Sequence, residues 1–367
     1  ILFFCDFFLY NNILISYIYT EQYDVTTEDG YILKMFRIVG DNNRPILLVH
    51  GGLDSSDSFV MRGNTSLAVE LARQNYDVWA INYRGNNNSR RHATLNPDTD
   101  GAFWDFSIHE IGYYDMPATV DLILKSTGQK RLSAIGYSEG ATALYVLGAL
   151  RPEYNNKIKV FISLAPICYM NDLEEYLASL IRMSSLINRA FMSIRVNEVF
   201  GYYSMFRRIY ELICTPKSSF DLCFKNGFLV FTGKENNEIE PEFAPVIVGH
   251  FPAGTSWKNA YHQAQIGQSG RFAMFDYGPS ENMARYKSTT PPAYDLSKVS
   301  MKIALFVSNS DPISTVKNVN LLRKNLPNTV EYRVMAGKAF GHLDFVWGRN
   351  THKTMHPQIF EILNKYK

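Results

Sequence analysis

The stretch that decides the fold runs from residue 132 to residue 150 and reads LSAIGYSEGATALYVLGAL. Leu132–Ile135 is a short continuous apolar run typical of a buried strand, and Ala141–Leu150 has the composition of a helix. Between them, Gly136, Ser138 and Gly140 form a Gly-x-Ser-x-Gly motif. A strand, a tight turn and a helix around this motif are typical of a serine nucleophile, because the glycines permit a close approach of strand and helix. We therefore predict that Ser138 is a nucleophile.

Further apolar runs along the chain are equally short and lack alternation with polar residues. Such runs, rich in Ile, Val, Leu and Phe, are typical of strands buried on both faces. Helical stretches separate them, and this alternation predicts an α/β fold with a parallel sheet covered by helices on both sides. The predicted strands are Ile46–Val49, Val78–Ile81, Leu132–Ile135, Val160–Leu164 and Ile303–Val307, and the predicted helices include Leu67–Gln74, Met116–Lys125 and Ala141–Leu150.

The alternation stops at about residue 167, where helix-rich and aromatic sequence replaces it, and resumes at Tyr294. The simplest interpretation is one α/β core interrupted by an insertion. Before the core, Asp29-Gly30 between two β-rich runs predicts a hairpin. The predicted organisation is an N-terminal segment with the hairpin at 1–45, the core at 46–166, the insertion at 167–290 and the core again at 291–367.

A serine nucleophile needs an imidazole base and a carboxylate that orients the imidazole. With this motif, the chain order is serine, acid, histidine. His342 lies in a loop soon after the strand-like Val330–Met335, where a final-strand histidine belongs. Asp311 lies just beyond the strand Ile303–Val307, at the end of a parallel strand where ligand sites form. We predict Asp311 and His342 as the catalytic partners; Asp344 is the alternative acid, but its position favours capping the following segment.

Two backbone N–H groups are predicted to hold the oxyanion of the reaction. Glu139 follows the nucleophile at a helix N-terminus, where N–H groups and the positive end of the helix dipole point outward. An early strand ends in His50-Gly51-Gly52-Leu53, a turn that lets a second N–H face the nucleophile. We assign this second N–H to Gly52, with Leu53 as the alternative, and expect His50 to brace the turn rather than to transfer protons.

Composition excludes several classes of protein. With 37 Lys and Arg against 35 Asp and Glu, the net charge is +2, which gives no support to nucleic-acid binding through phosphate contacts. The 46% of apolar residues and 20% of charged residues exclude a disordered chain. No apolar run is long enough for a transmembrane helix. The apolar residues at 1–13 fit either a signal-peptide remnant or a buried first element.

Long blocks outside the motif carry a family resemblance. They include Val25–Leu33, Phe103–Ser107, Gly112–Asp115, Pro252–Ser256, Pro291–Leu296 and His342–Phe345. Together they resemble the acid lipase family, which includes gastric lipase and lysosomal acid lipase, over residues 14 to 350. The resemblance implies an α/β-hydrolase core with a mostly parallel sheet, a helical cap formed by the insertion, and hydrolysis of neutral-lipid esters with neither cofactor nor metal.

The sequence departs from the family pattern beside the expected nucleophile. The family has a histidine before the serine and a glutamine after it, where this chain has Tyr137 and Glu139. Gly52 replaces an apolar residue of the family's oxyanion turn. The backbone donor at Glu139 survives the change. We hypothesise that the Glu139 carboxylate stabilises the imidazolium and shifts the working pH upward.

Of the four cysteines, two are expected to form a disulfide bridge and two are expected to be unpaired. Cys214 and Cys223 lie within the insertion at a spacing similar to the disulfide pair of the family, so the resemblance implies a bridge. Two free buried thiols are the alternative. Cys5 and Cys168 are expected to be unpaired.

Two N-glycosylation sequons begin at Asn64 and Asn87. With the expected disulfide, they favour the secretory pathway, ending outside the cell or in a lysosome.

We expect a serine-dependent carboxylic ester hydrolase that acts on triacylglycerol or steryl ester at a lipid interface. A carboxylesterase for short or non-lipid esters is the first alternative, and a non-catalytic lipid-binding homologue is the second. Neither a nucleic acid nor an obligate protein partner is expected.

Overall fold

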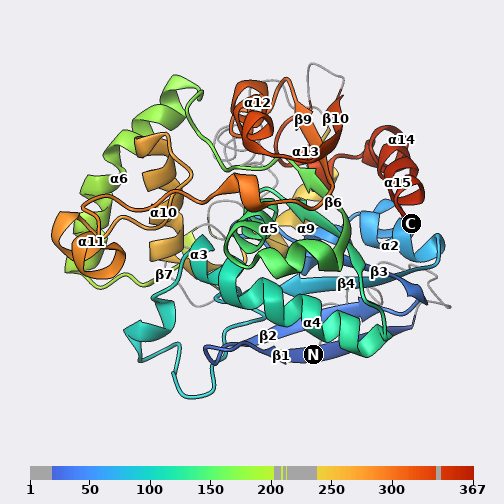
Figure 1. Ribbon diagram of the computed structural model, residues 1–367, viewed down its shortest axis with the longest axis horizontal. Coiled ribbons are helices and arrows are strands. Elements are labelled where there is room, and N and C mark those ends of the chain that lie inside the picture. Colours follow the sequence, from blue (N-terminus) through green and yellow to red (C-terminus); the bar gives the residue numbers. More distant parts are fainter. Residues whose placement is uncertain (1–18, 202–207, 210–211, 213–237, 336–339) are drawn as a thin grey trace.

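An eight-stranded sheet forms the centre of the computed structural model (Figure 1), which describes residues 19–201, 208–209, 212, 238–335 and 340–367. The strand order is β1-β2-β4-β3-β5-β6-β9-β10; β1 and β2 are antiparallel, β2 joins β4 antiparallel, and all other neighbours are parallel. The strands are β1 (Thr20–Thr26), β2 (Ile32–Ile38), β3 (Asp41–Val49), β4 (Tyr76–Asn82), β5 (Leu132–Tyr137), β6 (Ile158–Leu164), β9 (Ile303–Ser308) and β10 (Thr329–Met335). The predicted mostly parallel α/β sheet is thus confirmed.

The predicted hairpin is also confirmed. In it, Thr26 of β1 pairs with Ile32 of β2, and Gly30 in the connecting turn has a φ of 97°. A positive φ of this kind favours glycine, which explains why the Asp-Gly pair marked the turn. The hairpin extends the parallel sheet at the β4 edge.

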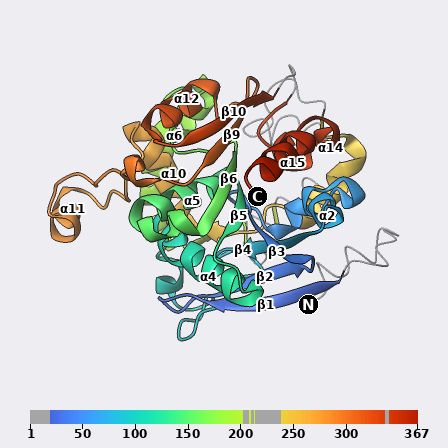
Figure 2. The same ribbon diagram turned by 45° about the vertical axis from the view of Figure 1, so that its right-hand side comes forward.

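Helices cover both faces of the sheet (Figure 2). One face packs on α4 (Met116–Thr127), α5 (Glu139–Leu150) and α12 (Val316–Asn325), and the other on α2 (Leu67–Arg73) and α15 (His356–Lys365). Successive side chains of β3 divide between the two cores, because residues alternate across a strand: Leu47 and Val49 join the first, Ile46 and Leu48 the second. The shorter helices include α3 (Ile108–Glu110), α13 (Asp344–Trp347) and α14 (Thr351–Thr354).

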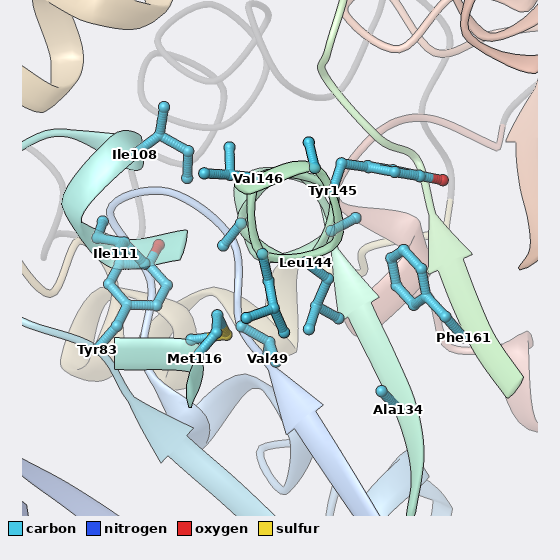
Figure 3. Packing of buried hydrophobic residues seen from close by; sticks show 14 of the residues in the cluster. Val49, Tyr83, Ile108, Ile111, Met116, Ala134, Leu144, Tyr145, Val146 and Phe161 are labelled. Carbon is cyan, nitrogen blue, oxygen red and sulfur yellow. The ribbon is translucent and has the colours of Figure 1, made fainter. Parts of the chain in front are cut away.

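Helix α5 is enclosed by apolar side chains on all sides. Figure 3 shows it end-on, with Val49 of β3, Met116 of α4 and Phe161 of β6 arranged around it. Every residue from Glu139 to Ala149 is buried, as expected for a helix that is hydrophobic all round. This packing holds the N-terminus of α5, and with it Ser138, in one position.

Strands β6 and β9 are neighbours in the sheet, although a long stretch of chain separates them. Three helices of that stretch, α6, α10 and α11, lie together on one side in Figure 1, where α6 packs against α10. Helix α9 lies apart from them and packs against Met61 and Trp347. No helix among the described residues is long and apolar enough to cross a membrane. The elements of this stretch are α6 (Glu175–Ser193), β7 (Glu198–Val199), α9 (Ala244–His250), β8 (Thr255–Ser256), α10 (Trp257–Ser269) and α11 (Pro279–Tyr286).

A buried ion-pair cluster ties the hairpin to the sheet and to the start of α4. The Arg84 guanidinium lies 2.8 Å (Nε) from Oδ1 of Asp115 and 2.6 Å (Nη1) from Oδ2 of Asp29. It also lies 3.9 Å from the ring centroid of Tyr31. The Arg84 and Asp115 side chains are 1% and 0% exposed. Losing Asp115 would leave the buried Arg84 charge with only Asp29, whose side chain is 25% exposed, as its partner.

We expect Asp115→Ala to lower the free energy of unfolding by about 3–5 kcal/mol, because the Arg84 charge then loses its fully buried partner. The control is Glu281→Ala on α11, which removes the exposed pair with Arg285 and should cost less than about 1 kcal/mol. Chemical denaturation of the three proteins measures both changes. Equal losses for the two variants would contradict a structural role for the buried cluster.

Candidate active site

Ser138 lies in the sharp turn between β5 and α5. Its backbone has a φ of 54° and a ψ of −119°, a conformation that L-residues rarely adopt. The Ser138 N–H donates to the carbonyl oxygen of Leu164 in the neighbouring strand at 2.9 Å, which anchors the strained turn to β6. The strain lifts the serine side chain out of the strand–helix junction, as the Gly-x-Ser-x-Gly motif requires.

Gly140 is what allows α5 to start so close to β3. A Cβ at Gly140 would overlap the carbonyl oxygens of Val49 and His50. No other residue could therefore occupy the position without separating the helix from the strand. The absence of a Cβ at Gly140 is thus what permits the predicted close approach of strand and helix.

Three residues that are far apart in the chain meet at the turn. The Nε2 atom of His342 lies 2.8 Å from Ser138 Oγ, and its Nδ1 atom lies 2.7 Å from Asp311 Oδ2. The other carboxylate oxygen of Asp311 accepts the backbone N–H groups of Ile313 and Ser314 at 2.9 and 2.8 Å. Because both oxygens of Asp311 are occupied, the carboxylate is fixed, and it fixes the imidazole with Nδ1 protonated and Nε2 facing the serine.

The alternative acid, Asp344, has a different position. It begins α13, and its Oδ2 atom accepts the backbone N–H of Gly341 at 2.5 Å. The expected capping of the following segment is therefore wrong, because Leu343 is the N-cap of α13 and no side-chain hydrogen bond caps this helix. The hydroxyl of Tyr137 donates to the carbonyl oxygen of His342 at 3.0 Å, so the residue that departs from the family's histidine supports the His342 loop.

The turn after β3, which we call the oxyanion loop (His50–Leu53), lies beside Ser138. His50 is fully buried; its Nδ1–H donates to the carbonyl oxygen of Gly51 at 2.8 Å, and its Nε2 accepts from Asn86 at 3.2 Å. Burial lowers the pKa of His50 to about 3, so the ring is neutral. The ring also stacks on Tyr83 with 3.9 Å between centroids. These contacts are those of a residue that braces the loop.

The Glu139 side chain makes contacts that the sequence did not reveal. Its Oε1 accepts from Asn259 Nδ2 at 2.7 Å and lies 3.2 Å from the Tyr83 hydroxyl, and its Oε2 lies 3.5 Å from Gln263 Nε2. Within the described residues, none of the hydrogen bonds of Glu139 reaches His342. Because Tyr83 follows β4 and the two amides lie on α10, the carboxyl connects α5 to segments remote in sequence.

A cavity of about 310 Å³ opens beside Ser138 and His342. Gly52 and Glu139, the predicted oxyanion donors, line it, together with the side chains of Asn259 and Gln263. Most of its remaining wall is apolar. The chain after β6 and helix α6 contribute a group of six apolar residues to this wall: Ile167, Met170, Leu173, Leu177, Leu180 and Ile181. Such a cavity suits an uncharged apolar group held next to the nucleophile.

The other residues that the sequence singled out lie away from this cavity or outside the described residues. Asn64 is exposed, and Asn87 is half-buried. Cys168 is a buried free thiol, as expected. Cys5 and the expected bridge between Cys214 and Cys223 lie outside the described residues.

Two family profiles match the chain. One, described as "alpha/beta hydrolase fold", matches residues 44–348, and the other, described as "partial alpha/beta-hydrolase lipase region", matches residues 14–63.

Among curated proteins, Lipase 1 of Drosophila melanogaster is 39% identical over 94% of this chain and 77% of its own length. Gastric triacylglycerol lipase is 33% identical in Bos taurus, over 95% of this chain and 89% of its own length. The Homo sapiens protein of that name is 32% identical over 95% and 88%.

Solved structures show the same fold at low identity. An esterase from Exiguobacterium antarcticum matches with a TM-score of 0.53 and 12% identity, over 94% of this chain and all of its own. A Sulfolobus solfataricus protein matches with a TM-score of 0.62 and 17% identity, over 95% of each chain. From the profile over most of its length and the relatives above 30% identity, the chain belongs to the acid lipase family of α/β hydrolases and is a carboxylic ester hydrolase.

Proposed function

We propose that this protein hydrolyses neutral-lipid esters, triacylglycerol or steryl ester, through an acyl-enzyme on Ser138. The observation that carries the proposal is that Ser138 Oγ lies 2.8 Å from His342 Nε2, and His342 Nδ1 lies 2.7 Å from Asp311, beside an apolar cavity. A non-catalytic lipid-binding protein has no need of this arrangement.

In the proposed mechanism, Ser138 Oγ attacks the ester carbonyl while His342 Nε2 takes the hydroxyl proton. Asp311 holds the imidazole in the required tautomer and stabilises the imidazolium. The backbone N–H groups of Gly52 and Glu139 bind the oxyanion, and the N-terminus of α5 adds its dipole. His342 then gives the proton to the leaving alcohol, and water repeats the sequence on the acyl-enzyme, which releases the fatty acid and restores Ser138.

We assign the chain between residues 167 and 290 the role of a cap that lines the acyl-binding cavity and meets a lipid surface. Leu180, Met183 and Leu186 on α6 are 49%, 53% and 60% exposed, and Leu180 also lines the cavity. This apolar face is therefore continuous with the space beside the nucleophile, which supports a lipid surface as its partner.

We also propose a location in the secretory pathway, either secreted or lysosomal. The exposed position of Asn64 suits a glycosylated asparagine. The expected bridge between Cys214 and Cys223 would form in the same compartment, and the bovine and human relatives are named gastric lipases.

We expect Ser138→Ala to lower kcat on a soluble ester by at least about 10⁴-fold, because the nucleophile is lost. Asp311→Asn should cause a loss of similar size, because the amide favours the wrong tautomer of His342. Initial rates with a p-nitrophenyl ester measure both effects, and circular dichroism checks folding. A folded Ser138→Ala protein with more than a tenth of the activity would exclude this serine as the nucleophile.

A series of esters with increasing acyl length separates a lipase from a short-chain carboxylesterase. We expect activity to persist on long-chain triacylglycerol or cholesteryl ester and to rise when the substrate forms an emulsion, because the cavity wall is apolar. Titration of released fatty acid gives the rates. A steady fall from short to long chains, without activation by emulsions, would favour the carboxylesterase.

The role of α6 can be tested by placing charge on its exposed face. We expect Met183→Glu or Leu186→Glu to lower the rate on emulsified triacylglycerol by about 10-fold and to leave the rate on a soluble ester within about twofold, because a buried carboxylate opposes insertion into lipid. The matched control is Val334→Glu on β10, another exposed apolar position. Equal effects on both substrates would argue against an interfacial role for α6.

A further inference from the structure

We propose that the Glu139 side chain is a positioning residue for the oxyanion loop, holding that loop ready for catalysis when its carboxyl is protonated and releasing it when ionised. The proposal rests on the serine mechanism above and concerns the side chain of Glu139, whereas the mechanism uses only its backbone. The loop carries the Gly52 N–H, one of the two proposed oxyanion donors.

The direction of the Gly52 N–H is set from the other side of the same peptide group. A trans peptide is planar, so the carbonyl of Gly51 and the N–H of Gly52 point in opposite directions. The Gly51 oxygen accepts from His50 Nδ1 at 2.8 Å and from the Tyr83 hydroxyl at 2.6 Å. These two donors hold the carbonyl, and they thereby orient the N–H of Gly52.

Glu139 affects the hydrogen bond from Tyr83 to Gly51, because Tyr83 has only one hydroxyl proton. The Tyr83 hydroxyl has one proton and two nearby acceptors, the Gly51 oxygen at 2.6 Å and Glu139 Oε1 at 3.2 Å. If the proton goes to Gly51, the Tyr83 oxygen can interact favourably with Glu139 only by accepting a proton from it. A neutral Glu139 satisfies both contacts, whereas an ionised Glu139 competes with Gly51 for the single Tyr83 proton.

The surroundings of Glu139 favour the neutral form. Its other hydrogen-bond partners, Asn259 and Gln263 of α10, are uncharged amides. Burial raises the pKa of the Glu139 carboxyl, and the side-chain hydrogen bonds oppose this only in part.

Among the described residues, the titratable groups around Glu139 include no Lys or Arg that would stabilise its ionised form. Two of these groups are Tyr83 and the neutral His50, whose ring stacks on Tyr83. The others are Asp54 and His342, which line the same cavity, and Asp311, the partner of His342. Burial raises the pKa of Asp54 to about 7, so this neighbour too resists ionisation.

The negative charge of an ionised Glu139 would weaken oxyanion binding, as would loss of the hydrogen bond from Tyr83 to Gly51. A Cβ on Gly52 would lie 2.9 Å from Glu139 Oε2, so the carboxyl is packed against the loop that should bind the oxyanion. An ionised carboxylate here would repel the developing oxyanion in a site of low dielectric constant. The two departures from the family pattern, Gly52 and Glu139, are thereby related, because the missing side chain makes room for the carboxyl.

The test is the pH dependence of single-turnover acylation by a soluble p-nitrophenyl ester, from pH 4 to 8.5, with active sites counted by an organophosphate. Wild-type kcat/KM should rise from the acid side to a maximum and fall again as Glu139 ionises. Glu139→Gln should keep the rise and lose the fall, so that its activity relative to wild type increases at least about 10-fold across the alkaline fall of the wild type. The control Glu281→Gln, the same change on α11, should follow the wild type.

Tyr83→Phe reports on the hydrogen bond itself. It should lower kcat about 10-fold or more at all pH values with KM within about twofold, because the Gly51 carbonyl loses a donor. Glu139→Gln should then have a smaller effect in the Tyr83→Phe background than alone, which a double-mutant cycle measures. Should Glu139→Gln fail to fold, Asn259→Leu replaces it, and the alkaline fall should move to higher pH because the carboxylate loses its nearest donor.

Identical pH profiles for wild type and Glu139→Gln would overturn the inference. So would a Glu139→Gln profile moved to lower pH, the result expected if the carboxylate instead supported the imidazolium. A folded wild type whose Ser138 takes up no organophosphate would overturn the proposed function as well, so the two failures are distinguishable.

Discussion

The site depends on how closely the start of α5 approaches the end of β3. Gly140 allows this approach, since a Cβ there would overlap the carbonyl oxygens of Val49 and His50. The approach sets Ser138 in its strained turn and brings the oxyanion loop beside Glu139. Because α5 is enclosed by apolar side chains, the geometry is held by the main core of the protein rather than by surface loops.

A layer of hydrogen bonds orients His342 and the oxyanion loop beside Ser138. Asp311 orients His342, Tyr137 holds the carbonyl of His342, and Tyr83 with His50 holds the carbonyl of Gly51. Each contact is buried, where a hydrogen bond fixes geometry more firmly than in water. Glu139 belongs to this layer, and its partner Asn259 brings α10 into it. The stretch between β6 and β9 thus both lines the cavity and contacts Glu139 beside the Ser138 turn.

Local features of the sequence predicted the fold and the three residues that meet at the turn after β5. Strands buried on both faces appear as unbroken apolar runs, the Asp29-Gly30 turn needs a positive φ, and Ser138 lies in a motif with a single geometric purpose. Asp311 and His342 could be found because parallel strands bring their carboxyl ends to one edge. The contacts of Glu139 could not, since Tyr83 and Asn259 lie 56 and 120 residues away and neither carries a motif of its own. The hypothesis that Glu139 supports the imidazolium came from nearness in sequence alone, which does not give the direction of a side chain.

Covalent labelling is the most direct measurement of whether Ser138 is the nucleophile. Folded protein is treated with diethyl p-nitrophenyl phosphate, and the adduct is located by peptide mass spectrometry while residual activity is followed. We expect one diethylphosphoryl group per chain, on the peptide that contains Ser138, with activity lost in proportion to labelling. Loss of activity with the adduct on another residue, or full activity after Ser138 is labelled, would contradict this assignment.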